Sequence, residues 1–236
     1  MFINFEERPS DSPLVERVWR SHSERSDEFS SIAACTWDMV LSRGRGGTSM
    51  IVRGPETRAT NAYCPTDGEW FAIRFKCGTY MPHFPPSILR DRNDVVLPNA
   101  ASRSFWLNGS AWDFPDFDNA ETFVNRLVRR ALLVTDPLLS DVLQGYVPPT
   151  TSDRTVQRRF LSIAGLTRSA VEQIERARSA TLMLREGRSI LDTVFEAGYY
   201  DQAHLTRSLK HFVGQTPAQI IRGERQLSFL YNTDAI

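Results

Sequence analysis

The feature that most constrains the fold of this chain lies near its carboxyl end, in residues 189–217 (SILDTVFEAGYYDQAHLTRSLKHFVGQTP). Apolar side chains recur at helical spacing in both parts of this segment, with Ile190, Val194 and Phe195 in the first and Leu205, Leu209 and Phe212 in the second. Gly198 stands between the two parts, and glycine adopts the left-handed backbone of a tight turn without strain. The pattern predicts two short helices packed across a turn, each burying one apolar face.

The second of these helices is predicted to keep a polar face exposed once its apolar stripe is buried. That face carries Gln202, His204, Thr206, Arg207 and Lys210. Arginine and glutamine pair bidentately with base edges, and basic side chains contact phosphates. A helix that follows a tight turn and presents such a face can enter the major groove of DNA. We therefore expect these residues to bind double-stranded DNA.

The same segment resembles the second helix-turn-helix of the AraC/XylS family of bacterial transcription regulators. The matching residues are Ser189, Ile190, Asp192, Gly198, Asp201, His204, Arg207, Lys210, Gly214, Thr216 and Pro217. The chain differs at Val194, where the family prefers alanine, and it has Tyr199, Leu205 and Leu209 at aromatic positions. The resemblance implies a sequence-specific regulator whose two helix-turn-helix units enter successive major grooves.

Residues 152–160 are similar to the recognition helix of the family's first unit. Ser152 is a suitable N-cap, and Val156 and Phe160 form the buried side. The residues expected to contact DNA from this helix are Arg154, Gln157, Arg158 and Arg159. Pro148 and Pro149 precede the unit, so the helix before them, predicted over 138–143, should end by Gln144.

A helix is predicted between the two units, over residues 169–186, with a capping box formed by Ser169 and Glu172. At about 1.5 Å per residue such a helix spans roughly 27 Å. Successive major grooves on one face of DNA lie about 34 Å apart. Once the offsets of the recognition helices are added, one chain can reach both grooves.

Apolar and polar residues alternate in residues 31–41, 48–53 and 70–76 of the amino-terminal half, which predicts short antiparallel strands. A helical pattern follows over 119–135. The apolar stripe of that helix packs either against the strands or against a second copy of the chain. We therefore expect an α+β chain, with residues 1–136 forming a β-rich regulatory domain with a terminal helix and residues 137–236 an all-α DNA-binding domain. Residues 75–97 loosely resemble the sensor-like domain of some AraC-type regulators, which implies no particular ligand.

Charge and composition agree with a localised DNA-binding face. The chain has 28 basic and 28 acidic residues, with 12 basic and 9 acidic residues from Thr151 onward. Neutrality overall excludes indiscriminate coating of nucleic acid. No apolar run reaches about 18 residues, so we expect a cytoplasmic protein with no membrane partner. Cys35, Cys64 and Cys77 are odd in number and scattered, as expected for reduced thiols.

The sequence offers no catalytic motif, and we expect no enzyme activity, cofactor or metal. Cys64, Cys77 and His83 are irregularly spaced for zinc, and the glycines of residues 43–47 do not close a phosphate-binding loop. Scattered aromatic residues form either the core of the β-rich domain or the wall of an apolar pocket. Candidate partners besides DNA are RNA polymerase, a small-molecule effector and a second copy of the chain. The alternative function is a protein-interaction module of the same fold that acts on polymerase or another regulator.

Overall fold

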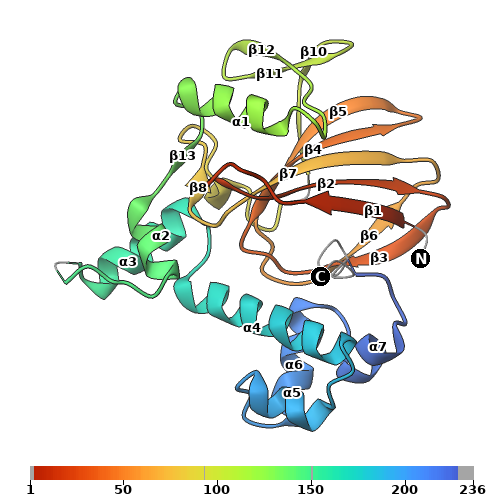
Figure 1. Cartoon of the computed structure of the whole chain (residues 1–236), viewed down its shortest axis with the longest axis vertical. Coiled ribbons are helices and arrows are strands. Elements are labelled where there is room, and N and C mark those ends of the chain that lie inside the picture. The colour runs from red at the N-terminus through yellow and green to blue at the C-terminus, as the bar shows by residue number, and fades with distance from the viewer. Residues whose placement is uncertain (1–2, 93, 150, 228–236) are drawn as a thin grey trace.

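The computed structural model describes residues 3–92, 94–149 and 151–227 of the chain. A β-rich part occupies the upper half of Figure 1 and a helical part lies below it, with α2 and α4 along the junction. The order of strands and then helices along the chain makes the fold α+β. No helix in the described ranges has the length and apolarity needed to cross a membrane.

The strands are β1 (Ile3–Arg8), β2 (Val15–Ser23), β3 (Asp27–Ser31), β4 (Trp37–Gly44), β5 (Gly47–Arg53), β6 (Thr60–Cys64), β7 (Glu69–Phe75), β8 (Thr79–Tyr80), β9 (Val95–Leu97), β10 (Asn99–Ala101), β11 (Ser104–Leu107), β12 (Ser110–Asp113) and β13 (Val134–Thr135). The helices are α1 (Ala120–Arg129), α2 (Pro137–Leu143), α3 (Asp153–Ile163), α4 (Arg168–Arg185), α5 (Ile190–Glu196), α6 (Gln202–Phe212) and α7 (Pro217–Arg222), with a 3₁₀ turn at Pro86–Ile88.

The β-rich part is built on a six-stranded antiparallel sheet in the order β1-β2-β7-β4-β5-β9. In its centre, β4 pairs with β7 so that Trp37 lies opposite Phe75 and Asp38 opposite Arg74. Separate pairings join β3 to β6, β8 to β13, and β10 through β12. Because side chains alternate between the faces of a strand, this register sends Met39 and Leu41 to the same face of the sheet.

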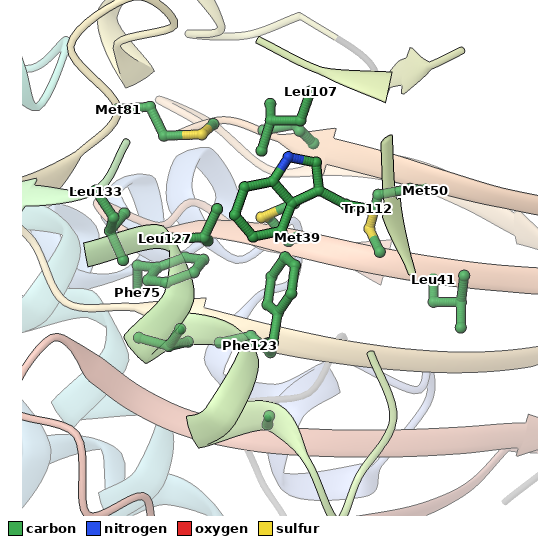
Figure 2. Packing of buried hydrophobic residues seen from close by; sticks show 14 of the residues in the cluster. Met39, Leu41, Met50, Phe75, Met81, Leu107, Trp112, Phe123, Leu127 and Leu133 are labelled. Carbon is green, nitrogen blue, oxygen red and sulfur yellow. The ribbon is translucent and has the colours of Figure 1, made fainter. Parts of the chain in front are cut away.

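The main apolar core lies between that face of the sheet and a cover formed by β11, β12 and α1. Figure 2 shows the rings of Trp112 and Phe123 beside Met39, with Met50 to the right of Trp112. The rings of Trp112 and Phe123 are 5.8 Å apart in an edge-to-face arrangement. The apolar stripe of α1 thus packs against strands of the same chain, through Phe123 and Leu127.

One helix expected from the sequence is shorter in the structure, and another is capped by a different residue. The helix predicted over 119–135 ends at Arg129, because Ala131 adopts a left-handed φ of 52°. The chain there turns back and buries Leu132 and Leu133 in the main core before β13 begins. The capping box predicted at Ser169 is also wrong, since the side chain of Thr167 caps α4 by accepting from the N–H of Ala170.

The strand predicted over 31–41 is interrupted. Ser31 ends β3, Trp37 begins β4, and residues 32–36 between them belong to neither strand. We call residues 32–36 the docking segment. Ile32 and Ala33 are buried among the helices, and the N–H of Ala33 donates to the carbonyl of Phe212 at 2.8 Å. Contacts with a distant part of the chain therefore override the local alternation of residues.

The helical part has two apolar clusters that share α4. The first contains Val156 and Phe160 of α3 with Leu139 of α2, and the second contains Leu205 and Leu209 of α6. The amino-terminal half of α4 supplies the first cluster and its carboxy-terminal half the second. Each cluster also includes residues of the docking segment, so the β-rich part completes the cores of the helical part.

Arg74 and Asp38 form a buried ion pair across the central strands, with N–O distances of 2.9 and 3.0 Å. Burial lowers the pKa of Arg74, but the charge and hydrogen bonds of Asp38, together with the nearby Glu16 and Glu7, outweigh this effect and leave that pKa above its ordinary value. Arg74→Met should lower the free energy of unfolding by about 3 to 5 kcal/mol, because it leaves a buried carboxylate unpaired. Urea denaturation followed by circular dichroism measures the change.

Arg25→Met is the matched control for this experiment. Arg25 pairs with Asp27 at 3.5 Å, with side chains 72% and 44% exposed. Exposed pairs of this kind contribute at most about 1 kcal/mol. Equal losses for Arg74→Met and Arg25→Met would contradict a stabilising role for the buried pair.

Candidate nucleic-acid interface

The second helix-turn-helix unit consists of α5, a turn at Gly198 and α6. Gly198 has a φ of +70°, the left-handed backbone that the sequence predicts. Both helices are capped at their first turn: the hydroxyl of Ser189 accepts from the N–H of Asp192 at 3.1 Å, and the carboxylate of Asp201 accepts from the N–H of His204 at 2.6 Å. The caps satisfy N–H groups that have no partner within the helix and fix where α6 begins.

The two faces of α6 differ as the sequence predicts. Leu205 and Leu209 are fully buried against α4, whereas Gln202, Arg207 and Lys210 are exposed. His204 and Thr206, also expected on the polar face, are partly buried. The exposed face therefore offers amide, guanidinium and ammonium groups to a partner.

His204 and Thr206 are engaged within the unit itself. The hydroxyl of Thr206 donates to the carbonyl of Gln202 at 2.8 Å, so its lone pairs remain available for an incoming donor. The Nδ1 atom of His204 lies 3.4 Å from the N–H of Tyr200, and the ring of Tyr199 meets the imidazole edge-on. These contacts orient the imidazole relative to the start of α6.

The first unit consists of α2 and α3. The hydroxyl of Ser152 caps α3 by accepting from the N–H of Thr155 at 3.3 Å. Val156 and Phe160 are buried, as predicted. The polar residues Arg154, Gln157 and Arg158 are exposed together on the opposite side.

Arg159 is exposed like its neighbours on α3, but it also forms an ion pair within the chain. Its guanidinium lies 3.0 Å from the carboxylate of Asp136, whose side chain is 4% exposed. Asp136 also caps α2 by accepting from the N–H of Leu139 at 3.0 Å. Arg159 is thus tied to the amino-terminal end of α2, and the ion pair helps to set the angle between α2 and α3.

The helix α4 joins the two units over 18 residues. At about 1.5 Å per residue its length is roughly 27 Å. Val171 and Ile174 pack against the first unit, while Ala180 and Leu184 pack against the second. Because one continuous helix contributes to both cores, the distance between the units is fixed by the backbone of α4.

The sequence gives no signal for the contacts that join the β-rich part to the recognition helix α6. The carbonyl of His211 accepts from the N–H of Ala59 at 2.8 Å, as that of Phe212 does from Ala33. Farther along the junction, Arg178 of α4 lies 3.5 Å from Glu16 of β2. Backbone hydrogen bonds leave no pattern in a sequence, so only the tertiary structure reveals that residues far apart meet at the end of α6.

One apolar side chain of α5 lies on a different face from that expected. Phe195 is 87% exposed, although its spacing from Ile190 placed it on the buried side. With Leu191 at 71% and Tyr200 at 91% exposure, it contributes to what we call the α5 patch, residues Leu191, Phe195 and Tyr200. The patch precedes the first turn of α6 in the sequence and is available to a partner.

Among the hollows in the described residues of the β-rich part, two have polar and aromatic side chains in their walls. One, of about 390 Å³, lies between the six-stranded sheet and the β3–β6 pair and is lined in part by Ser31, Arg53, Glu56 and Asp94. The other, of about 640 Å³, is bordered by the ends of β1, β2, β4 and β7. Burial raises the pKa of Glu56, whose carboxylate accepts from the hydroxyl of Ser31 at 2.8 Å.

Aromatic residues of the β-rich part lie both in the main core and in the walls of the hollows. Trp37 and Trp112 are buried in the main core, while Trp70 lines both hollows and Tyr63 lines the smaller one.

Comparison with known proteins identifies the helical part. The family model described as a helix-turn-helix domain matches residues 150–223. No match was found among curated proteins. A solved structure of ToxT from Vibrio cholerae is similar over 92% of this chain and 98% of that chain, with 8% identity and a TM-score of 0.44.

The matched segment spans α3 to α7 and contains the polar-faced helices of both units, α3 and α6. With the residue pattern of residues 152–160 and 189–217, the match makes the carboxy-terminal part an AraC-type helix-turn-helix domain. Such a domain is characteristic of DNA-binding transcription regulators.

The cap of α6 provides a test of how the recognition helix is held. Asp201→Ala should lower the free energy of unfolding by about 0.5 to 2 kcal/mol, because the N–H of His204 loses its acceptor. Asp201→Asn keeps an accepting side-chain oxygen and should retain most of the stability. Denaturant unfolding monitored by circular dichroism compares the two variants, and equal losses would contradict a capping role.

Proposed function

We propose that this chain is a sequence-specific transcription regulator that inserts α3 and α6 into successive major grooves on one face of DNA. The observation that carries the proposal is the presence of two capped helices with exposed polar faces, joined by a helix that belongs to both of their cores. The roughly 27 Å length of α4, with the offsets of the recognition helices, suits grooves about 34 Å apart. A single chain then reads two half-sites without a palindrome.

The exposed side chains suit different tasks at the DNA. In this proposal Arg154, Gln157 and Arg158 read one half-site, and Gln202, His204 and Arg207 read the other. Thr206 accepts hydrogen bonds, since its own proton is used within α6. Lys210, near the end of α6, contacts phosphate. Arg159 acts on DNA chiefly by positioning α3, because its guanidinium is held by Asp136.

Base readout by the two helices can be tested separately. Arg207→Ala should relax base preference in one half-site by about 1 to 3 kcal/mol and leave the other half-site unchanged, because arginine pairs bidentately with guanine. Arg158→Ala should do the reverse. Binding of each variant to a library of single-base operator mutants, selected first with the unmodified protein, measures the effect.

Arg188→Ala is the control for phosphate contacts, since Arg188 is exposed and lies 3.7 Å from Glu196. This variant should weaken all sequences about equally and reduce the slope of log affinity against log salt by about 1. Uniform losses for Arg207→Ala and Arg158→Ala would contradict their role as base readers. Affinity that does not change with salt would contradict DNA binding altogether.

We also propose that the β-rich part modulates DNA binding through the docking segment. The smaller hollow supports this proposal, because Glu56 in its wall accepts from Ser31 and exchanges two backbone hydrogen bonds of 3.0 Å with Ala34. Ser31 and Ala34 flank the residues that contact the end of α6. A small-molecule effector bound in this hollow would act on α6 through that short path.

The domain boundary proposed at residues 136 and 137 follows from the start of α2. A fragment of residues 137–236 should bind DNA with the base preference of the full chain but with altered affinity, because Ile32 and Ala33 no longer fill its cores. Ile32→Ala in the full chain should shift DNA affinity in the same direction and lower stability by about 2 to 5 kcal/mol.

Ile3→Ala provides the matched control, since Ile3 is equally buried but packs with Phe29 and Cys64 in a different cluster. Fluorescence anisotropy with labelled operator DNA measures the affinities. If Ile32→Ala and Ile3→Ala leave DNA binding equally unchanged, the proposed modulation through the docking segment is wrong.

The α5 patch supports a second role, as a contact for a protein bound beside the DNA. An aromatic and aliphatic surface of this exposure suits RNA polymerase or another regulator, and a second copy of the chain is a further candidate. If the chain acted only as an interaction module, Phe195→Ala would abolish regulation while Arg207→Ala and Arg158→Ala had no effect.

A further inference from the structure

Two of the three cysteines meet at the junction between the sheet and the helices. The pairing of β4 with β7 ends where Trp37 lies opposite Phe75, and the two cysteines lie two residues beyond that pair, Cys35 before Trp37 and Cys77 after Phe75. The neighbouring thiol of Cys77, together with burial, raises the pKa of Cys35 well above its ordinary value. Both side chains pack in the apolar cluster of α2, α3 and α4.

The arrangement suits a disulfide bond. Disulfides join residues whose Cα atoms are about 4.4 to 6.8 Å apart. The Cα atoms of directly opposite residues such as Trp37 and Phe75 lie about 4.5 to 5.5 Å apart, and the cysteines are only two residues beyond that pair. The paired strands end at Trp37 and Phe75, so both cysteines lie in bends beyond the sheet. Those bends can bring the two sulfur atoms to bonding distance without breaking the sheet.

The two thiols differ in access and in hydrogen bonding. Cys35 is 7% exposed, whereas Cys77 is only partly buried, so an oxidant in solution reaches Cys77 first. The thiol of Cys35 also donates to a carboxylate oxygen of Glu175, with the sulfur and oxygen 3.5 Å apart. Glu175 is 48% exposed on its side chain and can pass a proton to solvent.

We propose that Cys35 and Cys77 form a peroxide-sensitive dithiol site that closes to an intramolecular disulfide. The thiolate of Cys77 attacks hydrogen peroxide, forming a sulfur–oxygen bond and breaking the oxygen–oxygen bond, and the hydroxide released takes up the proton that Cys77 lost. The sulfur of Cys35 then attacks the sulfenic sulfur of Cys77. The sulfur–sulfur bond forms, the sulfur–oxygen bond breaks, and the Cys35 proton passes through Glu175 to the departing hydroxide. Two thiols lose two electrons and one peroxide becomes two waters.

Closure of the disulfide acts on the helices that hold the first unit. It removes the proton that Cys35 shares with Glu175 of α4. The carbonyl of Gly78, next to Cys77, accepts from the N–H of Asp136 at 3.0 Å where α2 begins. Drawing the two bends together therefore changes the contacts of α2 and α4 at once. This consequence rests on the proposed function, whereas the chemistry of the site does not.

The site is tested on the full reduced chain treated with hydrogen peroxide, quenched, unfolded and alkylated, followed by intact mass spectrometry and peptide mapping without reductant. We expect the loss of two hydrogen atoms, one remaining alkylated thiol at Cys64, and a crosslink between Cys35 and Cys77. Cys64→Ser, the matched control, should still form the crosslink. Cys35→Ser should stop at a sulfenic acid on Cys77, which dimedone traps.

Two results would overturn the site: three alkylated thiols after treatment, or crosslinks that involve Cys64 as often as Cys35. Operator affinity, measured on the same samples, should change severalfold on oxidation of the unmodified chain and remain constant for Cys77→Ser. An unchanged affinity in a chain with the mapped crosslink would overturn the transmission to the helices. Absence of DNA binding in the reduced chain would instead refute the proposed function and leave the mass result intact.

Discussion

The burial of α4 between two apolar clusters is the constraint on which the arrangement of the helical part depends. Ala177 and Ala180 are fully buried, and their small side chains let α6 and α7 approach the middle of α4 closely. A closely packed interior resists rotation of either unit, because rotation would open cavities along the helix. The separation and the relative orientation of α3 and α6 therefore follow from one continuous backbone.

The sheet and the helices are joined by main-chain hydrogen bonds as much as by side chains. The last carbonyls of a helix have no partner within it, and in α6 those of His211 and Phe212 accept from Ala59 and Ala33. The side chain of Arg90 donates a further hydrogen bond to the carbonyl of Gly165, just before α4. The β-rich part thus satisfies carbonyl groups at the ends of helices in the DNA-binding unit. A displacement of the sheet would change those hydrogen bonds.

Local sequence patterns predicted long elements with nearby contacts correctly, and short elements or distant contacts less well. The turn at Gly198 and the stripe of Leu205 and Leu209 were predicted correctly, since glycine at a positive φ and an eleven-residue helix give strong local patterns. Phe195 was placed on the wrong face because α5 has only seven residues, too few to define a stripe. Arg159 looked like its neighbours on α3, yet its partner Asp136 lies at the start of α2, and no local pattern predicts a contact across that helix and the following loop.

The sequence by itself determined the class of fold, the two helix-turn-helix units and the polar residues that they present, because helix caps, turn glycines and apolar periodicity are encoded within a few residues. Only the tertiary structure decided which segment of the β-rich part contacts α6, which cysteines meet, and which arginine of α3 is tied to α2. These contacts join residues far apart in the chain, through backbone groups and packed surfaces that every sequence contains. Their selection depends on how complete cores fit together, which local patterns do not record.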